Sequence, residues 1–364
     1  MTTRLLVLVA TGKGAFILET DAQRQSFDLH GPLCDGQPVN HVIADPATGT
    51  LYAAGGDEWH GAAVWRSADR GQTWTRLTSG LAYPDGPTHP QSDKLKTVWS
   101  LAAAGNRLYA GVEPAGLFAS DDQGQSWHHV EGLTNHPSRS DWVPGGGGLI
   151  LHHILAHPET PEQLWVGISV AGVFHSTDGG QSWSPRNQGT RCDFTGTGAT
   201  YPEVGQCVHS LAMAPGRPDR LYQQNHCGMY RSDDGGQSWV TIEDGLPSDF
   251  GFAIATHPHD PETLFLLPLV GAENRHVPDG KVAVWRSSDA GRTWQDLRQG
   301  LPQANAYLCV LRQAMATDAL TPAGIYFGST SGTLFASPNE GETWTTIAQH
   351  LPAIRAVETV VVGN

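Results

Sequence analysis

Lysine is scarce in this sequence, with only Lys13, Lys94, Lys96 and Lys281 in 364 residues, and the formal net charge is −14. Nucleic acids and anionic membrane surfaces recruit proteins through basic patches. The acidic balance therefore argues against both partner classes. We expect neither a nucleic-acid partner nor a membrane partner.

Long apolar runs and cysteines are also few. No run approaches the roughly 20 residues that a membrane-spanning helix needs. The apolar N-terminal stretch leads into Gly-Lys-Gly without a small-residue cleavage pattern, so we interpret it as a strand rather than a secretory signal. The five cysteines are odd in number, and we expect free thiols in a cytoplasmic protein. A disulfide between Cys192 and Cys207, which bracket one loop, is the alternative.

One eight-residue pattern, Ser-x-Asp-x-Gly-x-Ser/Thr-Trp, returns roughly every 50 residues, a spacing typical of propeller repeats. A sixth copy, Ser337–Trp344, has Asn339 in place of Asp, and a worn copy at Thr20–Phe27 has Ala22 and Arg24 at the Asp and Gly positions. The five complete copies are Ser67–Trp74, Ser120–Trp127, Ser176–Trp183, Ser232–Trp239 and Ser287–Trp294.

The octet has the chemistry of a tight turn that is rebuilt many times. Its aspartate accepts hydrogen bonds from backbone N–H groups, and its glycine takes a positive φ. The hydroxyl adds a local hydrogen bond, and the tryptophan packs as an aromatic wedge. We interpret these polar residues as structural rather than catalytic: Asp69, Asp122, Asp178, Asp234, Asp289 and Asn339.

The octets resemble the Asp-boxes (BNR repeats) of sialidase-like β-propellers, of the sortilin ectodomain and of related six- or seven-bladed proteins. The resemblance covers essentially the whole chain and is specific for fold rather than function. Sialidase activity is not favoured, because Arg4-Leu5-Leu6 does not match that family's N-terminal arginine motif and neither Tyr201 nor Tyr307 has an evident Glu partner. Xyloglucanase activity is not favoured either, since that family joins two such propellers.

Short strands with Gly- and Pro-rich turns separate the octets, which predicts an all-β, seven-bladed β-propeller of four-stranded antiparallel blades. The chain begins with sequence patterns typical of the second, third and fourth strands of a blade. It ends with a pattern typical of a first strand, Ala356–Val362. Pairing the two ends would complete the closing blade and remove its exposed edges. We therefore expect one propeller domain over residues 1–364. Its closing blade combines 1–30 with 353–364, and its other blades span about 38–79, 97–132, 149–188, 207–245, 250–300 and 307–350.

The loops that enter each first strand belong on the face opposite the Asp-box turns, around the channel mouth. Long loops at 82–97, 134–149, 189–207 and 271–281 agree with a site there. Aligned first strands place seven residues at the mouth, although a slip of one residue would replace them with neighbours such as His41, His153 and Ser210. The seven are Asn40, Trp99, His152, His209, Phe252, Arg312 and Arg355.

Two kinds of binding site are possible at this mouth. The third interpretation is that these residues are an ordinary, hydrated channel lining. Imidazoles of His152, His209 and His226 would suit a divalent transition metal. Alternatively, Arg312 and Arg355, joined by Arg275 or Arg191, would clamp an anion with planar donors. The expected catalytic residues are His152, His209, Arg312 and Arg355, and the expected substrate contacts are Trp99, Glu113, Phe252, Arg275 and Tyr307.

Three functions follow from these alternatives. We favour an enzyme of hydrolase or lyase type that acts on a small anionic or glycan-like substrate, with His152 or His209 as acid–base groups. A metal-dependent enzyme using the three histidines is the second. The third is a non-catalytic propeller that binds a peptide or protein, as sortilin-type or photosystem-assembly propellers do. A small molecule or glycan is the more strongly expected partner.

Overall fold

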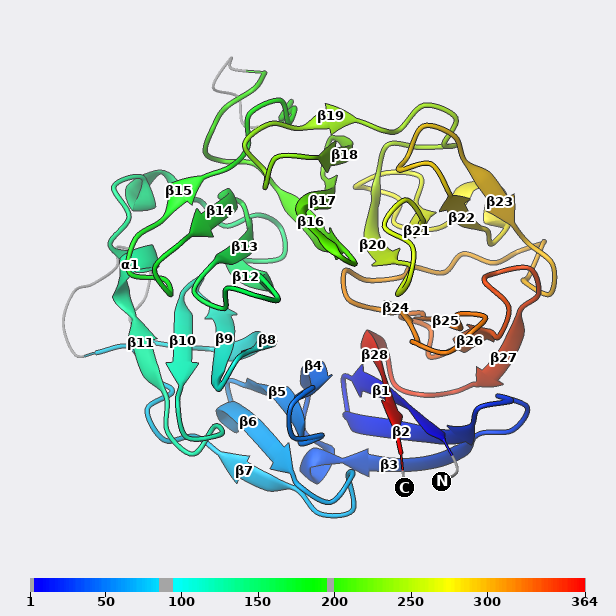
Figure 1. Cartoon of the computed structure of the whole chain (residues 1–364), viewed down its shortest axis with the longest axis horizontal. Coiled ribbons are helices and arrows are strands. Elements are labelled where there is room, and N and C mark those ends of the chain that lie inside the picture. The colour runs from blue at the N-terminus through cyan, green and yellow to red at the C-terminus, as the bar shows by residue number, and fades with distance from the viewer. Residues whose placement is uncertain (1–2, 85–93, 195–199, 364) are drawn as a thin grey trace.

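Seven four-stranded antiparallel sheets surround a central channel in the computed structural model (Figure 1). The structure describes residues 3–84, 94–194 and 200–363, so parts of the predicted loops 82–97 and 189–207 lie outside it. The predicted seven-bladed β-propeller is confirmed. Over the described residues, no helix combines the length and the apolar character that crossing a membrane requires.

In six blades the four strands follow the chain from the channel to the rim. They are β4 (Val39–Ala44), β5 (Leu51–Asp57), β6 (Gly61–Ser67), β7 (Thr75–Leu77); β8 (Thr97–Ala104), β9 (Arg107–Glu113), β10 (Leu117–Ser120), β11 (His128–Val130); β12 (Ile150–Ala156), β13 (Leu164–Ser169), β14 (Gly172–Ser176), β15 (Ser184–Pro185); β16 (Val208–Ala214), β17 (Arg217–Asn225), β18 (Gly228–Ser232), β19 (Val240–Thr241); β20 (Gly251–Thr256), β21 (Leu264–Pro268), β22 (Val284–Ser287), β23 (Gln295–Leu297); and β24 (Met315–Thr317), β25 (Ile325–Gly328), β26 (Leu334–Ser337), β27 (Thr345–Ala348). Short helical turns lie in the connections: α1 (Glu131–Thr134), η1 (Cys34–Gly36), η2 (Arg139–Asp141) and η3 (Pro278–Gly280).

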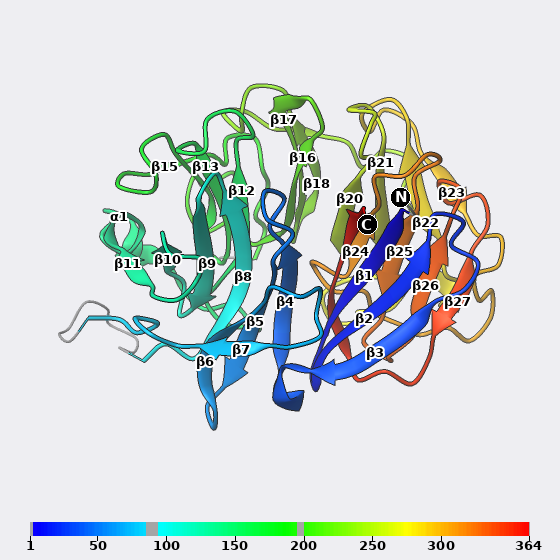
Figure 2. The same ribbon diagram turned by 60° about the horizontal axis from the view of Figure 1, so that its bottom comes forward.

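The seventh blade joins the two ends of the chain. It contains β28 (Ile354–Val362), β1 (Arg4–Thr11), β2 (Gly14–Asp21) and β3 (Asp28–Leu33), in that order. β28 pairs antiparallel with β1 from Arg4↔Val362 to Thr11↔Ile354, and the two strands lie side by side in both views of the ribbon (Figure 2). The predicted ring closure by the terminal strands is therefore confirmed.

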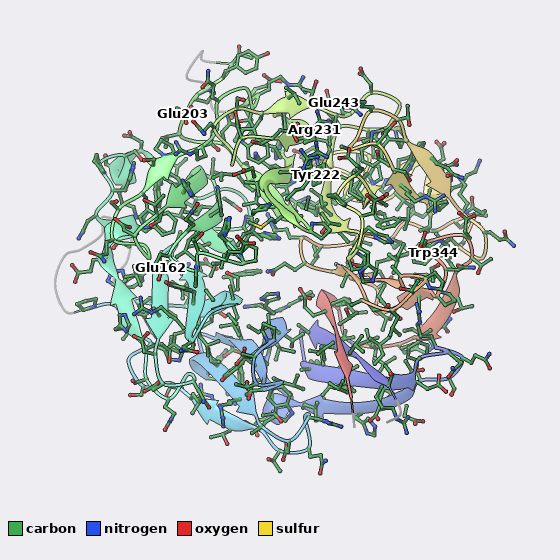
Figure 3. The ribbon with its side chains drawn as sticks, viewed as in Figure 1. Glu162, Glu203, Tyr222, Arg231, Glu243 and Trp344 are labelled. Carbon is green, nitrogen blue, oxygen red and sulfur yellow. The ribbon has the colours of Figure 1, made fainter. Side chains whose placement is uncertain are left out.

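The core lies between neighbouring blades rather than within any one of them. One apolar cluster joins Val7 of β1, Phe265 of β21 and Phe327 of β25, all fully buried. Side chains occupy the spaces between blades around the whole ring, as they do beside Tyr222 and Trp344 (Figure 3). Because a single sheet cannot cover its own apolar faces, each blade depends on its two neighbours.

The Asp-box turns join the third and fourth strands, as predicted. In the copy that follows β18, Asp234 Oδ1 accepts from the Ser238 N–H at 2.9 Å, and Asp234 Oδ2 accepts from the Ser238 hydroxyl at 2.6 Å. The Ser232 hydroxyl accepts from the Gly236 N–H at 2.8 Å. Gly236 has a φ of 85° and Gly235 a φ of 68°, so two consecutive residues adopt the left-handed conformation that glycine tolerates best.

The sixth Asp-box shows which property of the aspartate this turn needs. Asn339 Oδ1 accepts from the Thr343 N–H at 3.0 Å, as Asp234 does from Ser238. We therefore expect Asp234→Asn to preserve most of the stability. Asp234→Ala should lower the free energy of unfolding by about 1–2 kcal/mol, because turn N–H groups lose their acceptor. Urea unfolding of both variants tests this, and equal losses would contradict it.

The degenerate Asp-box Thr20–Phe27 is stabilised by contacts with a neighbouring blade. Arg24, which replaces its glycine, forms a buried ion pair with Asp318 of the preceding blade, with Nη1 and Oδ2 3.3 Å apart. Arg24 also donates to the carbonyl of Pro322 at 2.8 Å. A contact between blades thus supplements the weakened local turn.

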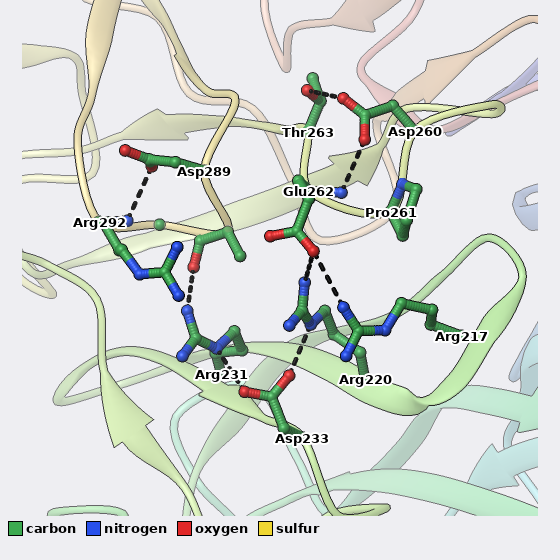
Figure 4. A network of polar contacts seen from close by, with 12 residues as sticks. Arg217, Arg220, Arg231, Asp233, Asp260, Pro261, Glu262, Thr263, Asp289 and Arg292 are labelled. Atoms are coloured by element: carbon green, nitrogen blue, oxygen red, sulfur yellow. Dashed lines mark hydrogen bonds and ion pairs between the residues drawn. The ribbon is translucent and has the colours of Figure 1, made fainter.

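A second tie between blades lies near the Asp-box of the blade that contains β18 (Figure 4). Arg220 Nε donates to Asp233 at 2.6 Å, and its guanidinium also bonds Glu262 of the next blade. Arg231 bonds the same Asp233 at 3.0 Å and the carbonyl of Ala290 at 2.7 Å. These contacts explain the charge clustered here without invoking a binding site.

Candidate functional site

Six of the seven residues predicted at the channel mouth occupy β-bulges of the inner strands. The pairing register jumps from Val39 to His41 in β4, and equivalent jumps occur in β8, β12, β16 and β20. In β28 the jump lies at Arg355. A bulge leaves an extra residue without a ladder partner and redirects its side chain. The residues skipped by these jumps include Asn40, Trp99, His152, His209, Phe252 and Arg355.

Several bulge side chains tie one blade to the next. His209 Nδ1–H donates to the Gly251 carbonyl at 2.7 Å, and His152 Nε2–H donates to the Val208 carbonyl at 2.9 Å. Arg355 Nη1 donates to Asn40 Oδ1 at 2.6 Å. Apart from Trp99 and Arg355, the skipped residues are almost completely buried. Their first evident role is therefore to hold the ring together.

The neighbouring positions line the channel instead. A cavity of about 490 Å³ runs along it and is lined from all seven blades, including His41, His153, Ser210 and Glu358. The sequence left open which of two neighbouring sets of inner-strand residues faces the channel. In the structure, the set with His41, His153 and Ser210 faces it. A sequence alignment cannot locate a bulge, because the bulge depends on pairing with the second strand.

His152 and His153 form one directional chain of hydrogen bonds. A carbonyl only accepts, so His152 carries its proton on Nε2 and accepts at Nδ1 from His153, 2.7 Å away. The Ser210 hydroxyl, 3.3 Å from His153 Nε2, completes the chain. Burial, then Arg312, holds the pKa of His152 well below its usual value, and burial lowers that of His153 to about 3. Both rings are neutral, and neither has a free nitrogen.

A histidine–carboxylate pair in the cavity was not predicted. His41 Nδ1 accepts from the Leu101 N–H at 3.0 Å, and His41 Nε2 lies 3.6 Å from Glu358 Oε1. Glu358 belongs to the last strand of the chain, far from His41 in sequence. Only ring closure brings these two residues together, so no local signal could have found the pair.

Arg312 and Gln313 cross the channel from the segment that precedes β24. Gln313 donates to the His152 carbonyl at 2.9 Å and accepts from the Val357 N–H at 2.8 Å. These bonds join three blades. Arg312 is half-buried, touches the cavity and packs its guanidinium 5.0 Å from the Phe252 ring centre.

Five side chains gather beside Arg312, and together with it we call them the mouth cluster: Cys207, His209, His226, Phe252, Arg275 and Arg312. The Arg275 guanidinium lies 5.7 Å from the Phe252 ring centre, so both arginines share one phenyl ring. The His209 ring lies 4.6 Å from the same ring and 5.4 Å from His226. This cluster brings together five residues predicted from the sequence, namely His209, His226, Phe252, Arg275 and Arg312, and adds Cys207.

Burial dominates the electrostatics of the mouth cluster. It holds the pKa of His209 well below the usual value, and Arg312 adds to that shift; it also lowers the pKa of His226, where Arg275 adds to the shift. It raises the pKa of the Cys207 thiol to about 11. It lowers the pKa of Arg312, and Arg275 adds to that shift. At neutral pH the cluster therefore contains neutral imidazoles, a protonated thiol and two positive guanidiniums.

The remaining predicted residues lie elsewhere. His152 is not with His209 and His226, and Cys207 takes its place near them. The predicted contacts Trp99 and Glu113 bond each other at 3.2 Å, while Tyr307 is 68% exposed and packs against His276.

Two further alternatives of the sequence are also resolved. Arg191 bonds Asp193 and Asp249, so it does not join an arginine clamp. Cys192 and Cys207 do not form a disulfide, so the alternative bridge is absent.

Comparison with known proteins supports the fold. The BNR/Asp-box repeat model matches residues 174–185. A probable oligoxyloglucan-reducing end-specific xyloglucanase of Neosartorya fischeri is 26% identical over 57% of this chain and 29% of its own length. The GH74 enzyme of Niastella koreensis superimposes with a TM-score of 0.61 at 16% identity, over 97% of this chain and 55% of that one.

A second kind of propeller is also similar. YCF48 bound to D1 peptide superimposes with a TM-score of 0.52 at 16% identity, over 84% of each chain. At such identities the superpositions establish the fold alone. The chain spans less than a third of the length of the curated relatives that it matches.

Proposed function

We propose that this seven-bladed Asp-box propeller is an enzyme acting on a small anionic, glycan-like molecule bound at the mouth cluster. The observation that carries the proposal is the pair of guanidiniums on the Phe252 ring. Neither Arg275 nor Arg312 forms an ion pair with any described residue. Two adjacent positive charges without a carboxylate favour a bound anion, and the missing counter-charge is most costly for Arg312, the more buried of the two.

Arg312 is the stronger anchor. Its Nε has no hydrogen-bond partner among the described residues, although the atom is buried. Buried donors are normally satisfied, and each exception calls for an explanation. A carboxylate or phosphate oxygen would satisfy this donor with a charge-assisted hydrogen bond. Arg275 is exposed on the loop above and would close over the same anion.

The chemical step is assigned to the imidazoles of the cluster. His226 is half-buried, and its lowered pKa keeps it neutral at neutral pH. A neutral imidazole accepts a proton from a hydroxyl or a water, which is the role of a general base. The names of the xyloglucanase relatives support a glycan as the substrate class.

A thermal-shift series tests this function. Uronic-acid oligosaccharides should raise the melting temperature of the wild-type protein by a few degrees, since a ligand that binds only the folded state stabilises it. Arg312→Gln should weaken binding about 10- to 100-fold, the loss of one charge-assisted contact. Arg191→Gln is the matched control, because Arg191 is already paired with Asp193 and Asp249. Equal responses of the wild type and Arg312→Gln would refute the anion clamp.

A peptide ligand is the second candidate. Four aromatic side chains are strongly exposed on the loops of this face: Trp59 at 93%, Tyr307 at 68%, Tyr201 at 65% and Phe194 at 41%. Such side chains are common where proteins bind other proteins, and the YCF48 structure holds a peptide. Uncharged xyloglucan oligosaccharides and peptides with free or amidated C-termini therefore belong in the same series. A response to peptides alone would select this second function.

A further inference from the structure

We propose that Cys207, His209 and His226 form a binding site for one zinc ion. Their ligand atoms all lie within 4.8 Å of one another. A tetrahedral zinc site with one sulfur and two nitrogen ligands places these atoms roughly 3.3–3.8 Å apart. A contraction of about 1 Å, available through side-chain rotation, would close the site.

The scaffold fixes two of the three ligands. Cys207 directly precedes β16, and His209 is the bulge residue of that strand, where its side chain is held by the Gly251 carbonyl. The His226 N–H donates to the Cys207 carbonyl at 2.9 Å, which joins the turn after β17 to the start of β16. All three ligands therefore belong to one blade and share one hydrogen-bonded frame.

The protonation of His209 suits a metal ligand. Its Nδ1–H is used by the Gly251 carbonyl at 2.7 Å, so Nε2 carries the lone pair. A backbone carbonyl that orients a histidine through its second nitrogen is a standard feature of metal sites. His152, whose two nitrogens are both engaged, has no such free position.

Aromatic side chains enclose the site. Phe250 lies 5.1 Å from His209 and 5.4 Å from His226, and Phe194 lies 4.6 Å from His226. An apolar wall limits water access and strengthens the attraction between a cation and a thiolate. Sulfur together with imidazole nitrogen favours zinc over magnesium or calcium, which prefer oxygen ligands.

The charges around the proposed zinc ion determine which fourth ligand it would take. Binding converts Cys207–SH and Zn²⁺ into a Cys207–S–Zn unit and releases one proton to solvent. One positive charge remains on the metal, close to Arg275 and Arg312. Three protein ligands leave a fourth position open, and these charges favour an anion or a hydroxide there. The zinc site would thus add a second contact for the anion of the proposed function, but it does not depend on that function. With zinc bound, His226 is a ligand and no longer serves as the general base.

Cobalt(II) added to metal-stripped protein tests the site, because a thiolate ligand gives cobalt a charge-transfer absorption. We expect one equivalent of cobalt to produce this band and zinc to displace it. Cys207→Ser should abolish the band, and His226→Gln should weaken binding at least tenfold. Cys227→Ser is the matched control, since this neighbouring thiol is outside the three-ligand group and should leave the band intact.

Several outcomes would overturn the proposal: no band in the wild-type protein, a band that survives Cys207→Ser, or full affinity in His226→Gln. If Cys207→Ser fails to fold, His226→Gln decides alone, because His226 is half-buried in a turn. Arg312→Gln should keep the band. The zinc site and the anion clamp can therefore fail independently.

Discussion

A chain that ends at Ala353, and so lacks β28, is expected to yield no stable folded monomer. β28 buries Ile354, Ala356 and Val357 completely. Each large apolar side chain contributes roughly 1.5–3 kcal/mol, and β1 loses its whole antiparallel partner. These losses rival the roughly 5–15 kcal/mol that stabilises an ordinary domain.

Circular dichroism and size-exclusion chromatography of the shortened chain would show the loss, with a chain ending at Val362 as the control. The peptide 353–364, added in trans, should restore a cooperative melting transition, because it supplies the missing strand to the exposed edge of β1. A shortened chain that melts at the wild-type temperature without the peptide would disprove the role assigned to β28.

Acid should destabilise the protein well above the pH at which its Asp-box carboxylates titrate. His152 and His153 stay neutral in the folded protein, since burial holds the pKa of His153 at about 3 and that of His152 well below 6.5. Unfolding frees both to bind protons near pH 6.5. The unfolded state therefore binds more protons between pH 6.5 and about 3, and stability falls as the pH falls.

The expected slope is about 1.4 kcal/mol per pH unit for each histidine, or roughly 3 kcal/mol for both. The charged or titratable groups that face the pair, Arg312, His41 and His209, do not favour its protonation. Urea unfolding of metal-free protein between pH 7 and 4 measures the slope, and His153→Gln should lower it by about 1.4 kcal/mol per pH unit.

The Asp-box carboxylates affect stability over a separate, lower pH range. Hydrogen bonds from the turn lower the pKa of Asp122 to about 2, so their contribution is complete above about pH 4 and is lost only below it. Stability that is flat down to pH 4 would show that the paired histidines do not control acid unfolding.

The sequence alone determined the architecture. The repeated octet, in which Asn339 replaces Asp once, predicts the same turn in each blade. The strand patterns at the two ends predict a closed ring. Both signals are local, since turn chemistry and strand patterning act over a few residues. The turn geometry at Asp234 and Asn339 and the pairing of β28 with β1 follow from them.

The tertiary structure decided the site. Bulges turned His152 and His209 toward neighbouring blades and left His41 and His153 in the channel. The sequence also gave no reason to place Cys207 beside His209 and His226, or Glu358 beside His41. Bulge positions and contacts between blades depend on strand pairing and ring closure, which join residues far apart in the chain. No pattern within a single repeat encodes them.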